Sequence, residues 1–339
     1  MMSTKEMHPM DELKEKLKVI LQAVPSGSSI YYIDYPLYDN GGDLLIMKGT
    51  EKFFADHNIN VMARYCLNDF PKKLSIPQNC IIVLQGGGNF GDLYPNHQGL
   101  REKVIERYPE HRIVILPQTI YYENDAAYDK AAAIVNKHRD LHIFVRDTVS
   151  LEQARTKFKC NLYLSPDMAH QLWPLLPSKE SSKEVLYFLR LDKEASGSQE
   201  SIPLQSSSDY QDWKTLYSFR EQLMIKFISK LTSLKGRIGL KFSMNFMWYL
   251  YSDHLVNKAH SLFSNYKVIK TSRLHGHILS CLMDKPHILV DNSYGKNSNY
   301  YNTWTYRCQS ARLNVSEAKL SGGMEHESLL GKFYRGASC

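Results

Sequence analysis

The sequence CIIVLQGGGNFGDLYPNHQ at Cys80–Gln98 joins a short apolar run to a glycine-rich segment. Its apolar part, Ile81–Leu84, does not alternate with polar residues, which is typical of a strand covered by helices on both faces of a parallel sheet. Similar runs recur in the first half of the chain, each followed by a turn and a helical stretch. They are SIYYIDYP (29–36), NINVMARY (58–65), RIVILPQT (112–119) and HIFVRD (142–147). This alternation predicts a doubly wound α/β domain.

The second half of the chain repeats the alternation after two polar segments. LLPSKESS (175–182) is predicted as a domain linker, and the serine-rich stretch 193–212 as a surface loop. Further strands are expected at VLYFLRL (185–191), RIGLKF (237–242), KVIKTS (267–272) and PHILVD (286–291), with helices over 213–233, over 245–265 and from Arg273. We therefore expect one domain over 1–176, a second over 183–315, a C-terminal tail or helix over 316–339, and a cleft between the two domains.

Bulk composition narrows the class of protein. The 339 residues are 43% hydrophobic and 23% charged, as in ordinary globular proteins, and the formal net charge is +7. Because the cations look scattered, an anionic substrate or an acidic membrane surface is favoured over nucleic acid. The six cysteines include no CxxC pair, and no signal peptide or long apolar span is recognised, which predicts a cytoplasmic protein. Association with the inner face of the membrane and oligomer formation are left open.

The glycine spacing Gly86-x-Gly88-x-x-Gly91 is that of a dinucleotide-binding turn, but its acidic partner is missing. Such a turn needs an Asp or Glu at the end of the next strand, where this chain has Pro-Gln-Thr at 117–119. A nicotinamide or flavin site is therefore disfavoured. Two readings stay open: a tight turn that packs strand on helix, or a loop where backbone approaches a ligand closely.

A second glycine loop follows the first predicted strand and has the same character. Both loops place an Asp after glycine at an expected helix start, where it either caps the helix or takes part in chemistry. The residues singled out in the two loops are Asn40, Gly41, Gly42 and Asp43 in the first, and Gly87, Gly88, Asn89 and Asp92 in the second.

Cationic residues follow several of the later strands. In VIKTSRLHGHILSC (268–281), Arg273 and His275 are expected in the first turn of a helix, whose free N–H groups already attract anions. His277 shares a face with Arg273, so the pattern does not choose between the histidines. Arg146 and Lys296 also follow strands. Together these cations would suit a small anion carrying phosphate and carboxylate, whereas no spacing typical of a metal site is found.

At these residues the chain resembles the polysaccharide pyruvyl transferase family. The resemblance rests on six segments in order, which are NGGDLLIMKG, LQGGGNFGDLYP, VILPQTI, FVRDTVSLEQA, SPDMAHQL and TSRLHGHILSCLMDKPHILVDNSYGK. It implies two Rossmann-like domains arranged as in GT-B glycosyltransferases. It also implies transfer of pyruvate from phosphoenolpyruvate, as donor substrate and without a cofactor, to a sugar or lipid-linked oligosaccharide of exopolysaccharide or biofilm-matrix synthesis.

The resemblance also implies roles for individual residues. Arg146, Arg273 and Lys296 are expected to bind the donor, and His275 rather than His277 is expected to act as the acid or to orient it. Asp43 and Asp92 would face the acceptor, one of them as a base. Two alternatives are kept: a GT-B nucleotide-sugar glycosyltransferase, and a non-catalytic sugar-binding protein of a polysaccharide assembly complex.

Overall fold

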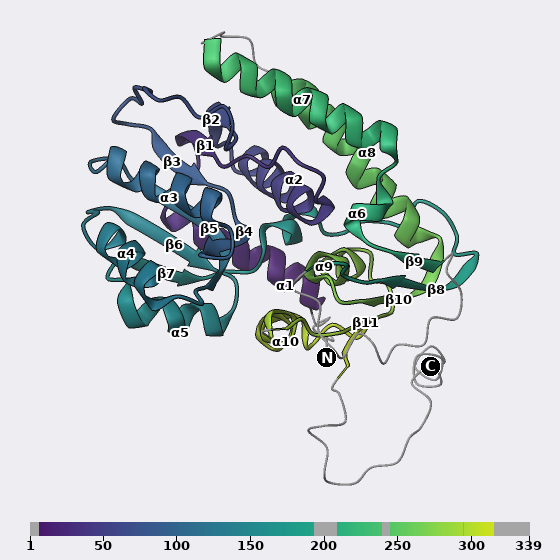
Figure 1. The fold of residues 1–339 in the computed structure, drawn as a ribbon. Coiled ribbons are helices and arrows are strands. Elements are labelled where there is room, and N and C mark those ends of the chain that lie inside the picture. The colour runs from purple at the N-terminus through teal and green to yellow at the C-terminus, as the bar shows by residue number, and fades with distance from the viewer. Residues whose placement is uncertain (1–6, 193–208, 239–244, 294, 315–339) are drawn as a thin grey trace.

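The computed structural model describes residues 7–192, 209–238, 245–293 and 295–314. In these residues the chain builds two parallel sheets one after the other, with helices around each (Figure 1). The strands of the first sheet lie between residues 29 and 164, and those of the second between 183 and 313. The α/β class expected from the sequence is therefore confirmed, while the C-terminal segment expected over 316–339 lies outside the described residues.

The first sheet has seven strands and is covered on both faces. Its strands are β1 (Ser29–Ile33), β2 (Asn60–Tyr65), β3 (Ile81–Leu84), β4 (Gly87–Gly91), β5 (Ile113–Tyr121), β6 (Leu141–Val145) and β7 (Asn161–Leu164). Val83 packs into one hydrophobic cluster with residues of α2 (Gly41–Asp56), while Ile82 and Leu84 pack into another with α3 (Pro95–Arg107). Two covered faces explain why β3 is apolar at every position.

The remaining helices of this part surround the sheet and its edges. They are α1 (Pro9–Lys16), η1 (Leu17–Gln22), α4 (Asp125–Val135), α5 (Thr148–Lys157) and η2 (Met168–Leu172). The second sheet has five strands, β8 (Lys183–Phe188), β9 (Tyr210–Gln211), β10 (Tyr266–Thr271), β11 (His287–Leu289) and β12 (Ala311–Leu313). Its helices are α6 (Trp213–Leu216), α7 (Phe219–Ile238), α8 (Asn245–Ser264), α9 (Leu274–Leu282), α10 (Lys296–Tyr300) and the π-helix η5 (Tyr301–Thr305). None of the described helices combines the length with the apolar composition that spanning a bilayer requires.

Strand order explains where a site forms. The first sheet runs β2-β1-β3-β5-β6-β7, with β4 beside β5, and the second runs β9-β8-β10-β11-β12. Both follow the flavodoxin-type doubly wound order rather than that of dinucleotide-binding domains. The chain reverses direction across the sheet between β1 and β3 and again between β8 and β10. Loops that leave neighbouring strands at such a point diverge and open a crevice at the carboxyl ends.

Several sequence-based expectations differ from the structure. Tyr210 and Gln211, which end the stretch expected as a surface loop, form β9. The helix expected over 213–233 is broken after Leu216, and α7 begins at Phe219. The strand expected over 237–242 is wrong at its start, because Arg237 and Ile238 end α7, and the rest lies outside the described residues. The glycine segment after β3 does not open a helix directly, because residues 87–91 first form β4 and pair with β5.

Candidate active site

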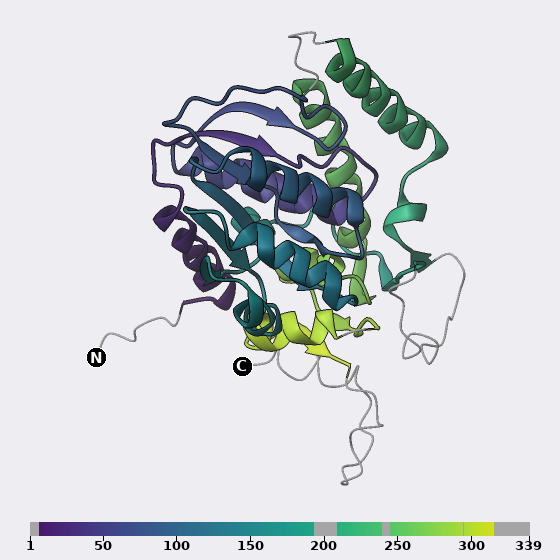
Figure 2. The ribbon, with the colours of Figure 1, turned by 60° about the vertical axis from the view of Figure 1, so that its left-hand side comes forward.

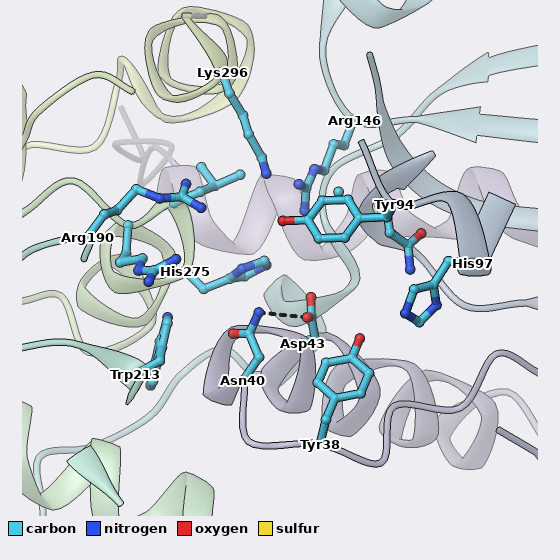
Figure 3. Close-up of a pocket in the computed structure, with 14 residues that line it drawn as sticks. Tyr38, Asn40, Asp43, Tyr94, His97, Arg146, Arg190, Trp213, His275 and Lys296 are labelled. Carbon is cyan, nitrogen blue, oxygen red and sulfur yellow. Dashed lines mark hydrogen bonds between the residues drawn. The ribbon is translucent and has the colours of Figure 1, made fainter. Parts of the chain in front are cut away.

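A cavity of about 300 Å³ collects side chains from both sheet units (Figure 3). From the first unit come residues of β4 and residues that follow β1, β4 and β6, and from the second come residues that follow β8, β9, β10 and β11. Its lining residues are Tyr38, Asn40, Asp43, Gly88, Asn89, Tyr94, His97, Arg146, Arg190, Trp213, Arg273, Leu274, His275 and Lys296. The four cationic residues expected to act together, Arg146, Arg273, His275 and Lys296, are thus brought to one cavity.

Arg146 is fully buried at the end of β6, yet one of its donor groups is unused. Its Nη1 donates to Asp167 Oδ2 at 2.6 Å and its Nε donates to Thr119 Oγ1 at 2.9 Å. Its Nη2 has no hydrogen-bond partner among the residues that the structure describes. A buried guanidinium N–H without a partner is costly, so this atom is set up to receive an acceptor.

Lys296 directs its ammonium group to the same place. A Cβ atom added at Gly88 would lie 2.5 Å from Lys296 Nζ and 3.0 Å from Arg146 Nη2. Both nitrogens therefore lie within hydrogen-bonding reach of one point above the Gly88 backbone. The glycine is needed here because any side chain would fill the space that the two cations share. Two converging positive charges in a buried pocket favour an anion between them.

His275 lies across the cavity, in the first turn of α9. Its Nε2 is 3.3 Å from Asp167 Oδ2, the same oxygen that accepts from Arg146. Burial raises the pKa of Asp167, but His275 and Arg146 outweigh this and hold that pKa well below its usual value. The ring also packs tightly on α2, since a Cβ at Gly42 would lie 2.7 Å from its Nδ1. Asp167 thus fixes both the arginine and the histidine.

Arg273 differs from the expectation that it binds a donor anion. It occupies the N-cap position of α9, and its Nε and Nη2 donate to the two carboxylate oxygens of Asp212 at 2.6 Å each. Its Nη1 donates to Asp192 at 2.7 Å, and Asp192 also accepts from Arg190. These acids lie in a stretch read from the sequence as a surface loop or beside it, so their role could not be recognised there. The guanidinium is thus already paired with two carboxylates, although Arg273 also lines the cavity.

The first glycine loop forms the opposite wall. Asn40 caps α2 by accepting from Gly42 N at 3.0 Å, and its Nδ2 donates to Asp43 at 2.8 Å. Asp43 lies in the first turn of α2 and faces the cavity (Figure 3). A Cβ at Gly41 would lie 2.5 Å from the ring of Trp213, so this glycine permits close packing of α2 on the second unit.

A histidine and carboxylate pair that the sequence analysis missed completes this wall. His97 Nδ1 is 2.7 Å from Asp34 Oδ1. Burial lowers the pKa of His97, but Asp34 and then Asp43 outweigh it, so that the pKa is raised above its usual value. Asp34 is buried, has φ of 65° and also accepts from Asn89 Nδ2. It directly follows β1, a position that the rule on strand ends could have identified.

Four of the eight residues singled out in the glycine loops do not line the cavity: Gly41, Gly42, Gly87 and Asp92. The Asp92 carboxylate accepts hydrogen bonds from the backbone N–H groups of Glu123 and Asn124, at 2.7 to 3.1 Å. Asp92 was expected to act in catalysis, but in the structure it joins its own loop to the segment that begins at Glu123. Gly87 has φ of 134° and sits behind the wall, where an added Cβ would meet Ile46 and Asp43.

Away from the cavity, three buried side chains could together offer ligands to a metal ion. They are His277, Cys281 and His287, the only such cluster found in the described part of the chain. Their ring nitrogens are already hydrogen-bonded: His277 contacts His287 at 2.7 Å and Thr305 at 2.8 Å, and His287 contacts the Lys285 carbonyl at 2.7 Å. Burial lowers the pKa of His287 to about 4 and that of His277 as well. A chain of neutral, paired rings accounts for this cluster.

Known proteins resemble this chain in sequence and in fold. The family model for polysaccharide pyruvyl transferase matches residues 40–294. The chain is 46% identical to "Putative pyruvyl transferase EpsO" of Bacillus subtilis, over 90% of this chain and 94% of that one. It is 30% identical to "Pyruvyl transferase 1" of Schizosaccharomyces pombe, over 84% and 71%. A crystal structure of an uncharacterized Klebsiella pneumoniae protein, 20% identical, superposes with a TM-score of 0.59 over 90% of this chain and 99% of its own, which shows a shared fold.

Proposed function

The chain belongs to the polysaccharide pyruvyl transferase family, and on that premise we propose that it transfers pyruvate from phosphoenolpyruvate to a sugar. The product would be a cyclic ketal on an exopolysaccharide or its precursor, with release of phosphate. The observation that carries this proposal is the meeting of Arg146 Nη2 and Lys296 Nζ above Gly88. Phosphoenolpyruvate, with a phosphate and a carboxylate on the same carbon atom, is an anion of suitable charge and size.

In this proposal the donor lies between the two cations and the start of α9. Leu274, the first residue of α9, lines the cavity, so the positive end of the helix faces the ligand as well. Arg146 and Lys296 would hold the phosphate and carboxylate, and Lys296 would assist the departing phosphate. Arg273, being paired with Asp212 and Asp192, would support α9 rather than bind the donor.

The reaction requires one acid and one base. A proton added to the methylene carbon of the donor makes a methyl group, and a sugar hydroxyl attacks the adjacent carbon. A second hydroxyl then attacks the same carbon as its bond to the phosphate oxygen breaks. Of the two hydroxyl protons, one balances the proton taken up by carbon and the other leaves on phosphate. His275 is the proposed acid, because its ring lines the cavity and the Asp167 carboxylate, 3.3 Å from its Nε2, fixes the orientation of that ring.

The acceptor would lie on the side of Tyr38, Asp43 and His97. We infer that His97 takes the hydroxyl proton, since Asp34 holds its Nδ1 at 2.7 Å and Nε2 makes no hydrogen bond to any described residue. Asp43 would orient the same hydroxyl. Tyr38, Tyr94 and Trp213 offer aromatic faces on which a sugar ring can pack.

The test is donor binding followed by turnover. Calorimetry should detect phosphoenolpyruvate binding to the wild type, and phosphate release should require an added sugar from a panel of aryl glycosides. His275→Gln should bind the donor, melt like the wild type and release no phosphate. Binding of nucleotide sugars in place of phosphoenolpyruvate would overturn the proposal in favour of a glycosyltransferase, and binding of sugar with no turnover would favour a sugar-binding protein. The proposed reaction uses no cofactor. We also propose that the two sheet units are arranged as in GT-B glycosyltransferases.

A further inference from the structure

Helices α7 and α8 expose a group of large apolar side chains. Phe219 is 74% exposed and Phe246 is 70% exposed, which is unusual for aromatic residues. More than half of the large exposed apolar side chains found in the described residues lie on these two helices. They are Phe219, Leu223, Met224, Phe227 and Leu234 on α7, and Phe246, Met247 and Leu250 at the start of α8. We call these eight residues the apolar patch.

The patch is separate from the face by which α7 packs on the molecule. Ile225, Ile228 and Thr232 of α7 are buried, whereas Leu223 and Phe227, four residues apart, share the outward face. Figures 1 and 2 both show α7 as an outermost helix, with α8 nearer to the body of the molecule. Helix α7 therefore has two apolar faces. One is buried against the rest of the molecule, and the other is exposed.

Basic residues accompany the patch, and acidic residues are nearly absent. Arg220, Lys226 and Lys230 are exposed on α7. The sequence 219–250 holds six Lys or Arg residues and a single acid, Glu221, which already pairs with Lys258 and His254. The cations are therefore concentrated in this part of the chain. This corrects the expectation that they are scattered along the sequence.

We propose that this patch and its basic residues form a docking surface for a lipid bilayer that contains anionic headgroups. Phe, Leu and Met side chains on a helix flanked by Lys and Arg are the features of helices that lie in the membrane interface. The apolar side chains would enter the boundary between headgroups and acyl chains, and the lysines would contact anionic headgroups. A second copy of the chain fits this surface less well, because pairing it with itself would bring like charges together.

The docking surface is continuous with the acceptor side of the cavity. A groove of about 560 Å³ runs between α7 and the loop after β1, and Lys226 and Leu234 line it. Tyr38 lines both this groove and the catalytic cavity. Docking would therefore bring the cavity close to the bilayer, where a sugar on a lipid carrier could reach it. This last step rests on the proposed function, whereas docking itself does not.

Sedimentation of the full chain with lipid vesicles tests the proposal. The protein should sediment with vesicles of phosphatidylcholine and phosphatidylglycerol, bind pure phosphatidylcholine far more weakly, and be released by high salt. Lys226→Gln/Lys230→Gln should weaken partitioning roughly 30-fold, because each lysine near an anionic surface contributes about fivefold. Leu223→Ser/Phe227→Ser should weaken it roughly tenfold or more.

Matched controls alter exposed residues of the same kinds elsewhere. Lys137→Gln/Lys159→Gln, after α4 and α5, and Leu176→Ser, with 79% exposure, should leave partitioning unchanged. Equal sedimentation of the wild type and the two-lysine variant would overturn the proposal, as would equal binding to neutral vesicles. Light scattering that shows a dimer dissociated by Leu223→Ser/Phe227→Ser, without vesicle binding, would assign the patch to a second copy instead. Phosphate release with a lipid-free acceptor should be the same in all these variants, so failed docking leaves the proposed chemistry untouched.

Discussion

A single methyl group at position 42 should test whether the position of His275 governs turnover. Gly42 lies in the first turn of α2, directly against the histidine ring. In Gly42→Ala the new Cβ would lie 2.7 Å from His275 Nδ1 and 2.9 Å from its Cβ and Cγ. Ordinary contacts between such atoms begin at about 3.5 Å. The ring or the helix must therefore move by roughly 0.5 to 1 Å.

Two opposing effects decide the outcome. Alanine favours a helix over glycine by at most about 1 kcal/mol, while overpacking a filled site costs about 1 to 3 kcal/mol. The net loss of stability should therefore be about 2 kcal/mol or less, which the fold can tolerate. A displacement approaching 1 Å at a reacting group costs about 100-fold in rate. We expect kcat to fall roughly 10- to 100-fold while phosphoenolpyruvate binding falls much less, because Arg146 and Lys296 stay in place.

The chain offers a matched control in Gly99. This glycine is exposed within α3, and a Cβ added there would meet no atom within 4 Å. Gly99→Ala should raise the melting temperature, through about 1 kcal/mol of helix propensity, with kcat unchanged. Both variants are assayed by phosphate release, calorimetric binding of phosphoenolpyruvate and thermal melting. If Gly42→Ala turns over like Gly99→Ala, the contact between α2 and His275 does not set the rate and the reasoning is wrong.

Three further changes probe the charges around the cavity. Arg146→Lys keeps a cation for Asp167 but removes Nη2, so calorimetry should show phosphoenolpyruvate binding weakened at least tenfold, while the exposed Arg139→Lys should bind normally. Asp167 has a lowered pKa, so its stabilising contribution is present above its ordinary pKa of 3.8 and lost as pH falls. The melting temperatures of Asp167→Asn and the wild type should therefore differ at neutral pH and converge in acid. If His97 is the base, activity should rise with pH through its raised pKa, and Asp34→Asn should move that acidic limb to lower pH.

The sequence predicted five of the seven strands of the first sheet, most clearly β3, whose four residues are all apolar and are covered by helices on both faces. The short edge strand β7, whose residues are exposed or only partly buried, was not predicted. The sequence analysis missed β4, where glycines replace the apolar pattern and pairing with β5 decides the structure. It also ran the expected helix 213–233 through Tyr217 and Ser218, where the backbone leaves the helix after α6. At both places the local sequence has little preference for helix or strand, so tertiary contacts determine the secondary structure.

The candidate site divides in the same way. Arg146, Lys296 and His275 were identifiable because each follows a strand, and strand ends of a parallel sheet meet at one edge. The acids that determine what these cations do were not identifiable. Asp167 and Asp212 act on Arg146 and Arg273 across 21 and 61 positions of sequence, so their pairing exists only in the folded chain. Without these acids, the sequence does not distinguish Arg146 from Arg273, because each is an arginine that follows a strand.

The difference between these two arginines supports the proposal that an anion binds at one place in the cavity rather than over its whole surface. Arg273 has both carboxylate oxygens of Asp212, and a further carboxylate from Asp192. Breaking such a buried pair to bind a ligand would leave an unpaired charge and would cost about 3 to 5 kcal/mol. Arg146 gives Asp167 only its Nη1 and retains Nη2, so a ligand can bind there without breaking any ion pair. Selectivity for a small dianion would then arise from how the acids are distributed behind the arginines, and exchanging Asp212 for Asn should expose a second anion site while weakening α9.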